Sequence, residues 1–323
     1  MEITHIEKTD KTISGIITAT PPFDFAQSLS FLENSGANDR LDMVNADEAN
    51  LVRPMLLADH PHRVTLSAED GTDIRVTVRT PDGEDAPAED ILQHAAEWAN
   101  HRFWLDVDMN AVKDAIGGDD YGDMLVDTQF PSRPANYPSA WEALLISVVH
   151  AQIYPGLAQK LDDTLAEVYG RQATFEGEKA YLTPRPFDLL RAFEDELRGM
   201  KFSRQKADYL TTFPQTIMDN PKDYNFIAMR DEEGEEVVKR LKDLRGVGAW
   251  TSQNVAMRGL PHKDVFIDEK TTRKAIAPFY YRNEDEITKG NFQKTVARFA
   301  PYRSFACYYT YMHHFGMSDS EDS

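Results

Sequence analysis

Asp268 is the residue whose type and position are best suited to chemistry. It follows a short apolar stretch, Val265-Phe266-Ile267, and lies downstream of a glycine turn, Leu244-Arg245-Gly246-Val247-Gly248. A carboxylate can stabilise the positive charge that builds on a sugar when an N-glycosidic bond breaks, or it can orient the attacking water. Asp is also a favoured helix N-cap, so a purely structural role for Asp268 is the alternative interpretation.

The glycine turn is a candidate site for binding a nucleic-acid backbone. Gly246 and Gly248 permit backbone angles that a side chain would forbid, and they expose main-chain N–H groups. A helix is predicted to begin directly after them, and the positive end of its dipole also favours an anion. The apolar Val247 between the glycines argues against a flexible linker. We therefore expect a helix, a tight turn and a second helix that together hold a phosphate.

Aromatic residues could form a pocket for a base near this turn. Trp250 follows the turn directly, and the chain also offers Phe23, Phe31, Trp141, Tyr302, Tyr308 and Tyr311. Enzymes that act on a base flip it out of the duplex and hold it between aromatic or apolar faces. Any one of these residues, taken alone, is more typical of a hydrophobic core.

A break in an apolar helix supplies a further candidate. The helix that opens at Ser139 ends where Ala151-Gln152-Ile153-Tyr154 meets a Pro-Gly pair. An apolar side chain at such a break could enter a duplex at the place that a flipped base has left. Ordinary turn chemistry is the alternative.

Two domains are predicted to position these residues. The alternating apolar residues at 63–68 and 73–80 indicate a β-hairpin, with a strand expected at 12–17 and helices near 25–32 and 90–104. Residues 117–139, rich in Gly, Pro and Asp, are predicted to be a linker. Helical patterns follow at 139–149, 156–169, 186–197, 203–218 and 234–242. We expect an α+β chain with an α/β domain at 1–116 and an all-α domain at 117–323.

Composition limits the class of protein. The 323 residues include one cysteine, so neither a disulfide framework nor a four-cysteine cluster is possible, and no catalytic metal site is expected. No apolar run is long enough to span a bilayer and no signal pattern is present, so we expect a cytoplasmic protein. The net charge of −19 argues against a phosphate-binding surface, but the acidic residues are clustered in runs that are typical of solvated faces.

These motifs resemble the helix-hairpin-helix DNA glycosylase superfamily, in particular the bacterial inducible 3-methyladenine DNA glycosylase II type. The resemblance is carried by LRGVGAWTSQNVAMRGLPHKDVF, by Pro301-Tyr302-Arg303-Ser304, by Pro21-Pro22-Phe23-Asp24 and by Gln152-Ile153, in the family's order. It implies a TBP-like N-terminal domain of antiparallel strands and helices, followed by an all-α helix-hairpin-helix glycosylase domain.

The resemblance also implies an activity and residue roles. It implies a monomeric, monofunctional glycosylase that flips an alkylated purine such as 3-methyladenine out of damaged double-stranded DNA and hydrolyses its glycosidic bond. Asp268 would be the catalytic carboxylate, Ile153 the wedge, and Trp250 and Tyr311 part of the base pocket. The other implied pocket residues are Phe31 and Asn254, and the other implied DNA-binding residues are Gln152, Leu244, Arg245, Gly246, Val247, Gly248, Thr251 and Arg303.

No organic cofactor is implied, although the family binds a monovalent cation through hairpin carbonyls. Bifunctional relatives have a lysine nucleophile where this chain has Trp250, so no lyase activity is expected. We further expect Lys242, Arg245, Arg258 and Arg303 to face the DNA and the acidic runs to face away.

The chain departs from the family pattern at three places. The spacer before the catalytic carboxylate is shorter, which leaves Glu269 as a rival to Asp268. Asn254 and Met312 stand where aromatic residues are expected, which makes the pocket less aromatic and leaves the lesion open. Excision of an oxidised or deaminated base is the alternative within the class, and a non-catalytic hairpin module that grips DNA is the alternative outside it.

Overall fold

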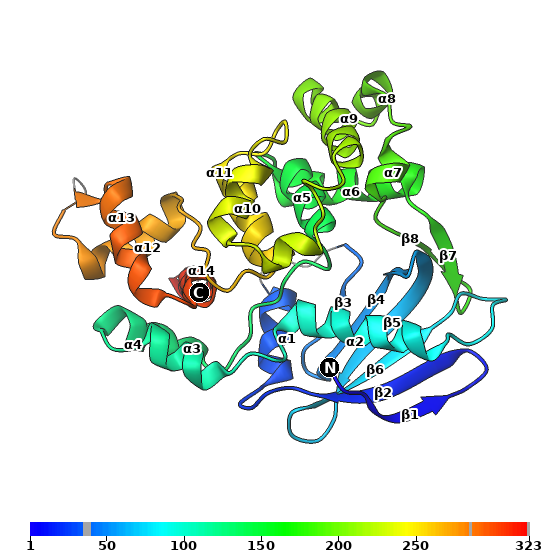
Figure 1. The fold of residues 1–323 in the computed structure, drawn as a ribbon, viewed down its shortest axis with the longest axis horizontal. Helices are drawn as coiled ribbons and strands as arrows, with labels where there is room; N and C mark the ends of the chain where they lie inside the picture. Colours follow the sequence, from blue (N-terminus) through cyan, green and yellow to red (C-terminus); the bar gives the residue numbers. More distant parts are fainter. Residues whose placement is uncertain (35–39, 284–285, 322–323) are drawn as a thin grey trace.

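The chain forms an antiparallel sheet with helices in its N-terminal part and a larger, mainly helical part after it (Figure 1). The computed structural model describes residues 1–34, 40–283 and 286–321. This mixture of strands and helices agrees with the α+β class expected from the sequence. Within these ranges no helix is long and apolar enough to cross a membrane.

The N-terminal sheet has six strands in the order β1-β2-β6-β5-β4-β3. Their bounds are β1 (Thr4–Lys8), β2 (Thr12–Thr18), β3 (Met43–Asn45), β4 (Asn50–Leu57), β5 (His60–Ala68) and β6 (Asp73–Arg79). The predicted hairpin is confirmed, because β5 and β6 pair with Val64 opposite Val78 and Leu66 opposite Val76. All four side chains are fully buried. Alternation places them on one face, which α1 (Phe25–Asn34) and α2 (Glu89–Phe103) help to cover.

The prediction of a linker at residues 117–139 is wrong over much of that range. After α3 (Met109–Ile116), the segment α4 (Asp120–Gln129) is a helix. Asp119 caps it by accepting the Gly122 N–H at 2.8 Å, and Tyr121 and Leu125 are buried one turn apart. The glycines and aspartates that suggested a linker are therefore the capping sequence of a packed helix.

The helical part contains ten further helices and one small hairpin in the described residues. The helices are α5 (Ala140–His150), α6 (Pro155–Tyr169), α7 (Pro186–Leu189), α8 (Glu194–Gly199), α9 (Arg204–Asp219), α10 (Gly234–Leu241), α11 (Ala249–Asn254), α12 (Lys270–Tyr280), α13 (Lys289–Val296) and α14 (Arg303–Glu321). Short 3-10 turns lie at Ala228–Asp231 and Ala297–Phe299.

The hairpin of β7 (Gln172–Phe175) and β8 (Glu178–Tyr181) corrects the all-α expectation for this part. Its turn residues Glu176 and Gly177 have φ angles of +54° and +82°. Their N–H groups donate to the Asp82 carboxylate, at 2.9 and 2.8 Å. The strands are short and largely polar, so their pattern did not stand out, and contact with the N-terminal part stabilises them.

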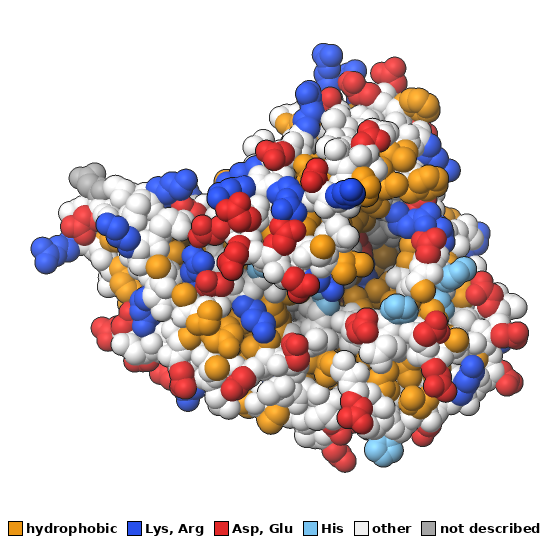
Figure 2. All heavy atoms as spheres, viewed as in Figure 1, with side chains coloured by type: hydrophobic (Ala, Val, Ile, Leu, Met, Phe, Trp, Pro, Cys, Tyr) orange, Lys and Arg blue, Asp and Glu red, His pale blue; other side chains and the backbone are white. Residues whose placement is uncertain are grey.

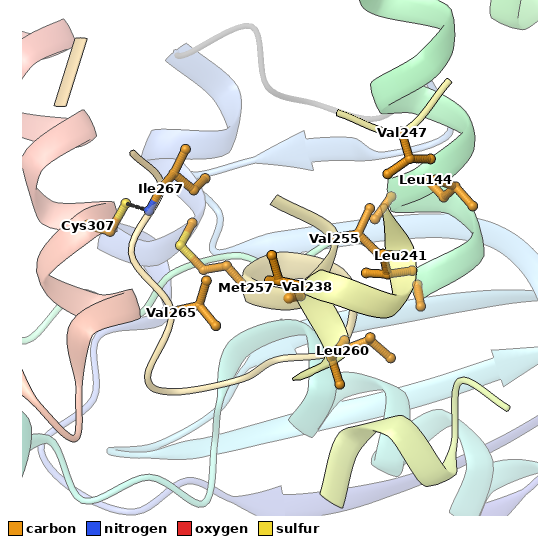
Figure 3. Close-up of a cluster of buried hydrophobic side chains, with 14 of the residues drawn as sticks. Leu144, Val238, Leu241, Val247, Val255, Met257, Leu260, Val265, Ile267 and Cys307 are labelled. Atoms are coloured by element: carbon orange, nitrogen blue, oxygen red, sulfur yellow. Dashed lines mark hydrogen bonds between the residues drawn. The ribbon is translucent and has the colours of Figure 1, made fainter. Parts of the chain in front are cut away.

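A close approach between α5 and the end of α11 organises the helical core. Beyond Asn254 the helix continues as a π-helical turn, Val255–Gly259. A Cβ on Gly259 would lie 2.8 Å from the Cβ of Ala143, so this contact requires glycine. Figure 3 shows the apolar cluster formed here, in which Leu144 of α5 lies close to Val255 and Val247.

A buried ion-pair network joins the N-terminal sheet to the helical part. The Asp42 carboxylate has no exposed surface and accepts from Arg53 at 2.9 Å and from Arg102 at 2.5 Å. Arg53 also donates to Glu142 of α5 at 2.5 Å. Because both guanidinium groups are buried, loss of the Asp42 charge would remove the buried negative partner that they share.

We expect Asp42→Asn to lower the free energy of unfolding by about 3–5 kcal/mol, since it removes one partner of a buried ion pair. Denaturant unfolding followed by fluorescence measures this change. Glu236→Gln is the matched control, because its partner Lys239 is exposed, and it should change the free energy by less than about 1 kcal/mol. A loss for Asp42→Asn as small as for the control would contradict the role of the network.

Candidate nucleic-acid interface and active site

The glycine turn has one face in the core and one face in solvent. The side chains of Leu244 and Val247 are buried, and the Val247 N–H donates to the Leu244 carbonyl at 3.0 Å. Gly246 has a φ of +92°, and a Cβ there would overlap the ring of Tyr209. The sequence folds as a tight turn here because two apolar side chains anchor it and Gly246 takes the left-handed conformation.

Gly248 differs from Gly246 in its physical role. Its φ of −87° is open to any residue, and a Cβ built on it would meet no atom within 4 Å. The first bond inside α11 runs from the Ser252 N–H to the Gly248 carbonyl at 3.0 Å, so the N–H groups of residues 249–251 have no acceptor within the helix. The turn therefore presents backbone donors at an unobstructed helix start, the arrangement that suits a phosphate.

Trp250, Tyr311 and Glu269 come together beside this turn. Trp250 in α11 is 40% exposed, and its side chain lies close to that of Tyr311 in α14. The Tyr311 hydroxyl donates to Glu269 Oε1. Burial, followed by the neighbouring Cys307 and Glu269, raises the pKa of Tyr311 above its usual value, so the phenol keeps the proton that it donates. Tyr311, one of the predicted pocket residues, thus contacts the rival carboxylate directly.

Asp268 lies one residue earlier and is held differently. Its Oδ1 and Oδ2 accept from the Arg273 guanidinium at 2.5 and 3.0 Å, and Gln293 donates to Oδ2 at 3.5 Å. The Asp268 side chain is 9% exposed. The hydrogen bond to Asp268 raises the pKa of Arg273, so the pair is a stable ion pair. These three hydrogen bonds fix the orientation of the Asp268 carboxylate. Because a carboxylate has about four acceptor positions, Oδ1 can still accept a further hydrogen bond.

The backbone that carries both carboxylates has no regular structure and depends on side chains for its hydrogen bonds. Ser304 Oγ accepts the Val265 N–H at 3.0 Å, and Cys307 Sγ accepts the Ile267 N–H at 3.4 Å (Figure 3). Gln253 accepts the Asp268 N–H at 3.2 Å and donates to the Phe266 carbonyl at 3.3 Å. The sequence reasoning missed Gln253 and Gln293; the position of Gln253, one turn after Trp250, was the available signal.

No family model matches the sequence. The chain is 23% identical over 222 residues to a DNA-3-methyladenine glycosylase of Bacillus subtilis (strain 168), covering 68% of this chain and 71% of that protein. It is 25% identical over 177 residues to DNA-3-methyladenine glycosylase 2 of Escherichia coli (strain K12), covering 52% and 55%. The curated relatives that it matches are thus covered over 55% to 71% of their length.

Solved structures extend this similarity over nearly the whole chain. A 3-methyladenine DNA-glycosylase from Archaeoglobus fulgidus superposes with a TM-score of 0.74 at 20% identity, covering 94% of this chain and 99% of that one. An 8-oxoguanine glycosylase/lyase of Clostridium acetobutylicum, in complex with DNA, superposes with a TM-score of 0.70 at 15% identity, covering 99% and 100%. This chain has the helix-hairpin-helix DNA glycosylase fold. The resemblance stated from the sequence is confirmed.

Of the remaining predicted site residues, four line one hollow, whereas Asn254 does not. Gln152, Ile153, Gly246 and Thr251 line one hollow of about 650 Å³ between the α5–α6 turn, α9 and the hairpin. Asn254 is 2% exposed and donates to Ser147 of α5 at 3.1 Å, so it joins two helices and does not line an open cleft. Phe31 lies in α1, but its side chain falls outside the described part of the structure.

The expected basic face is only partly present. Lys242 and Arg245 are exposed, although Arg245 pairs with Asp208 at 2.6 Å. Arg258 was wrongly expected there: it stacks 4.6 Å from the centre of the Tyr137 ring and donates to the Ala135 carbonyl.

Arg303 holds Asp264 through two bonds of 2.7 and 2.9 Å. Glu235 belongs to the acidic run 231–236 and approaches Arg303 to 3.8 Å, so this run lies beside a residue that was expected on the basic face and is not separated from it. Figure 2 shows acidic and basic side chains interspersed on the face in view. Across the described ranges, no group of three or more His, Cys, Asp or Glu residues could hold a metal ion.

Substitution of the two hairpin glycines by alanine should have different effects: one should lower stability and the other should lower DNA affinity. Gly246→Ala forces a left-handed angle and an overlap with Tyr209, so it should lower the free energy of unfolding by about 1–2 kcal/mol or more. Gly248→Ala should leave that free energy within about 0.5 kcal/mol of wild type and weaken DNA binding, because its methyl group stands where a phosphate would approach. Denaturant unfolding and fluorescence anisotropy with an undamaged duplex measure the two effects. Wild-type DNA affinity in Gly248→Ala would show that the hairpin does not contact the backbone there.

Proposed function

We propose that this protein is a monofunctional DNA glycosylase that excises alkylated purines such as 3-methyladenine from double-stranded DNA, acting as a cytoplasmic monomer. The observation that carries the proposal is the convergence of Trp250, Tyr311 and two carboxylates beside an unobstructed hairpin. The relatives named as DNA-3-methyladenine glycosylases support the substrate class. The proposed reaction uses no organic cofactor. The proposal includes a monovalent cation bound by the hairpin carbonyls.

The domain organisation is part of this proposal. We place a TBP-like domain at residues 1–116 and the glycosylase domain at 117–323. Two separate clusters of buried apolar residues support this division, one running from Ile13 to Leu105 with Ala135, and the other from Trp104 to Tyr309. The change from one cluster to the other falls near residue 105, before the proposed boundary, because Met109, Val112 and Ile116 of α3 pack in the second cluster. The Asp42 network connects the two parts.

The proposed chemistry follows from the charge that develops on the sugar. The hairpin N–H groups hold a phosphate, and the flipped base enters beside Trp250 and Tyr311. As the glycosidic bond breaks, the deoxyribose acquires oxocarbenium character, which a fixed negative charge stabilises. An alkylated purine carries positive charge and leaves readily, so no strong leaving-group acid is needed. The carboxylate then orients the water that completes hydrolysis.

We assign the catalytic role to Asp268 and keep Glu269 as its rival. Arg273 and Gln293 fix the Asp268 carboxylate in one orientation, which favours a preorganised charge, and the guanidinium reduces its net field. Glu269 accepts from the neutral phenol of Tyr311 beside the proposed pocket, and it is also the N-cap residue of α12, where it forms a capping box with Thr272. The spacing of Ile267-Asp268 and Arg273 favours Asp268 as the catalytic residue. The contact with Tyr311 favours Glu269.

The absence of a lysine at position 250 supports hydrolysis without lyase chemistry. Trp250 has no amine that could attack the sugar, so a Schiff base cannot form at that position. Excision of an oxidised base is the second candidate, favoured by the structural similarity to an 8-oxoguanine glycosylase/lyase. Duplexes that carry 8-oxoguanine should therefore be assayed beside methylated DNA.

Release of free base from methylated duplex DNA tests the proposal. Wild type should release 3-methyladenine, and Asp268→Asn should lower the single-turnover rate by about 100-fold or more, because it removes the charge that stabilises the sugar cation. Glu269→Gln should retain most activity, and the exposed Glu236→Gln serves as the control for charge loss. The assay is repeated over a range of salt concentrations, since DNA binding weakens as salt rises.

Each other outcome has a definite meaning. A selective loss in Glu269→Gln would move the catalytic role to that residue. Equal losses in both variants would mean that the two carboxylates act together. No base release by wild type from either methylated or 8-oxoguanine DNA, at any salt concentration at which the protein binds a duplex, would favour a non-catalytic DNA-binding module.

A further inference from the structure

The turn between α5 and α6 exposes a different side chain from the one that the sequence indicated. Ile153 is half-buried and packs against the helical core, whereas Tyr154 is 65% exposed. Ile153 also lines the hollow that Gly246 and Thr251 line. Tyr154 is not among the residues that line this hollow. The most accessible apolar surface of the turn is therefore an aromatic ring.

The backbone holds this ring on a defined platform. Tyr154 occupies the N-cap position of α6, with φ −73° and ψ 151°, and Pro155 follows at the first helical position. Proline restricts φ and removes an N–H that would have no partner, so the helix start is well defined. A Cβ on Gly156 would lie 3.2 Å from Tyr154 Cε2, which shows that the ring rests close to the first turn of α6. The preceding Gln152 has a φ of +57°.

The location of the turn connects Tyr154 to the DNA-facing hairpin. Gln152 and Ile153 share one hollow with Gly246 and Thr251, so the turn and the hairpin border the same concave surface. In Figure 1, α5 lies beside α11, and α6 follows α5 directly. A duplex held by the hairpin backbone would therefore lie close to the exposed ring.

We propose that Tyr154 is the side chain that enters the base stack at the damaged site, and that Ile153 anchors the turn from inside. This inference rests on the proposed function, because a gap in the stack exists only when a nucleotide has been flipped out. An aromatic ring stacks on any base, so it can occupy the gap whatever base stands opposite. Ile153 supports the ring by packing the turn against the helical core.

A duplex with a tetrahydrofuran abasic analogue opposite 2-aminopurine tests the inference. Wild type should bind this duplex more tightly than an undamaged one. Tyr154→Ala should lose about 10-fold of that preference, because it removes the ring that would stack on the neighbouring base. Tyr154→Phe should keep the preference, because the ring and not the hydroxyl stacks. The fluorescence of 2-aminopurine should differ between wild type and Tyr154→Ala complexes at saturating protein and should match between wild type and Tyr154→Phe.

Two controls separate this effect from folding and from unspecific loss of aromatic surface. Phe187→Ala removes a ring of similar exposure, 63%, on α7, and should leave both affinities unchanged. Ile153→Ala should lower the midpoint of denaturant unfolding, and Tyr154→Ala should not. An unchanged preference in Tyr154→Ala, or a loss confined to Ile153→Ala, would overturn the assignment of the ring.

The failure of this inference can be distinguished from the failure of the proposed function. If wild type releases methylated bases and prefers the abasic analogue while Tyr154→Ala behaves like wild type, only the inference is wrong. If wild type neither releases a base nor prefers the abasic analogue over undamaged DNA, the proposed function is wrong, and the inference is overturned with it.

Discussion

The candidate active site depends on a short buried segment that has no regular secondary structure. Val265, Phe266 and Ile267 bury their side chains, so their backbone groups lie where water cannot pair them. Unpaired backbone groups are costly in such a place, and the fold supplies side-chain partners. Ser304 and Cys307 of α14 accept the N–H groups of Val265 and Ile267. Ser304, Gln253 and Thr272 donate to the carbonyls of Val265, Phe266 and Ile267, respectively. Both candidate carboxylates take their positions from this arrangement.

The sequence blocks that carry the family resemblance thus have a positioning role as much as a proposed binding role. The Tyr-Arg-Ser sequence after Pro301 ties the segment to α14, because Arg303 pairs with Asp264 and Ser304 bonds the backbone. Gly259 allows α5 to approach the end of α11 closely, which brings the α5–α6 turn to the hairpin. A few short-range steric and hydrogen-bonding constraints therefore bring together elements that are distant in the chain.

Acidic composition and DNA binding are compatible if affinity rests on oriented backbone donors more than on a field of basic side chains. The hairpin presents N–H groups at a helix start, and such dipoles act at short range. The nearby basic residues are largely engaged: Arg245 with Asp208 and Arg303 with Asp264. The long-range attraction that speeds association of most DNA-binding proteins is correspondingly weak for a chain of net charge −19.

Sequence by itself determined the local features: the alternation of β5 and β6, the tight turn between buried Leu244 and Val247, and the residue types able to bind a base. Such features depend on side-chain period and on allowed backbone angles, both of which are local. Tertiary structure alone decided that Tyr311 meets Glu269, that Asn254 and Arg258 face inward, and that α4 and the β7–β8 hairpin are ordered. The reason is physical: burial and hydrogen-bond partners come from elements far apart in the chain, and no local pattern records which surface will cover a given side chain.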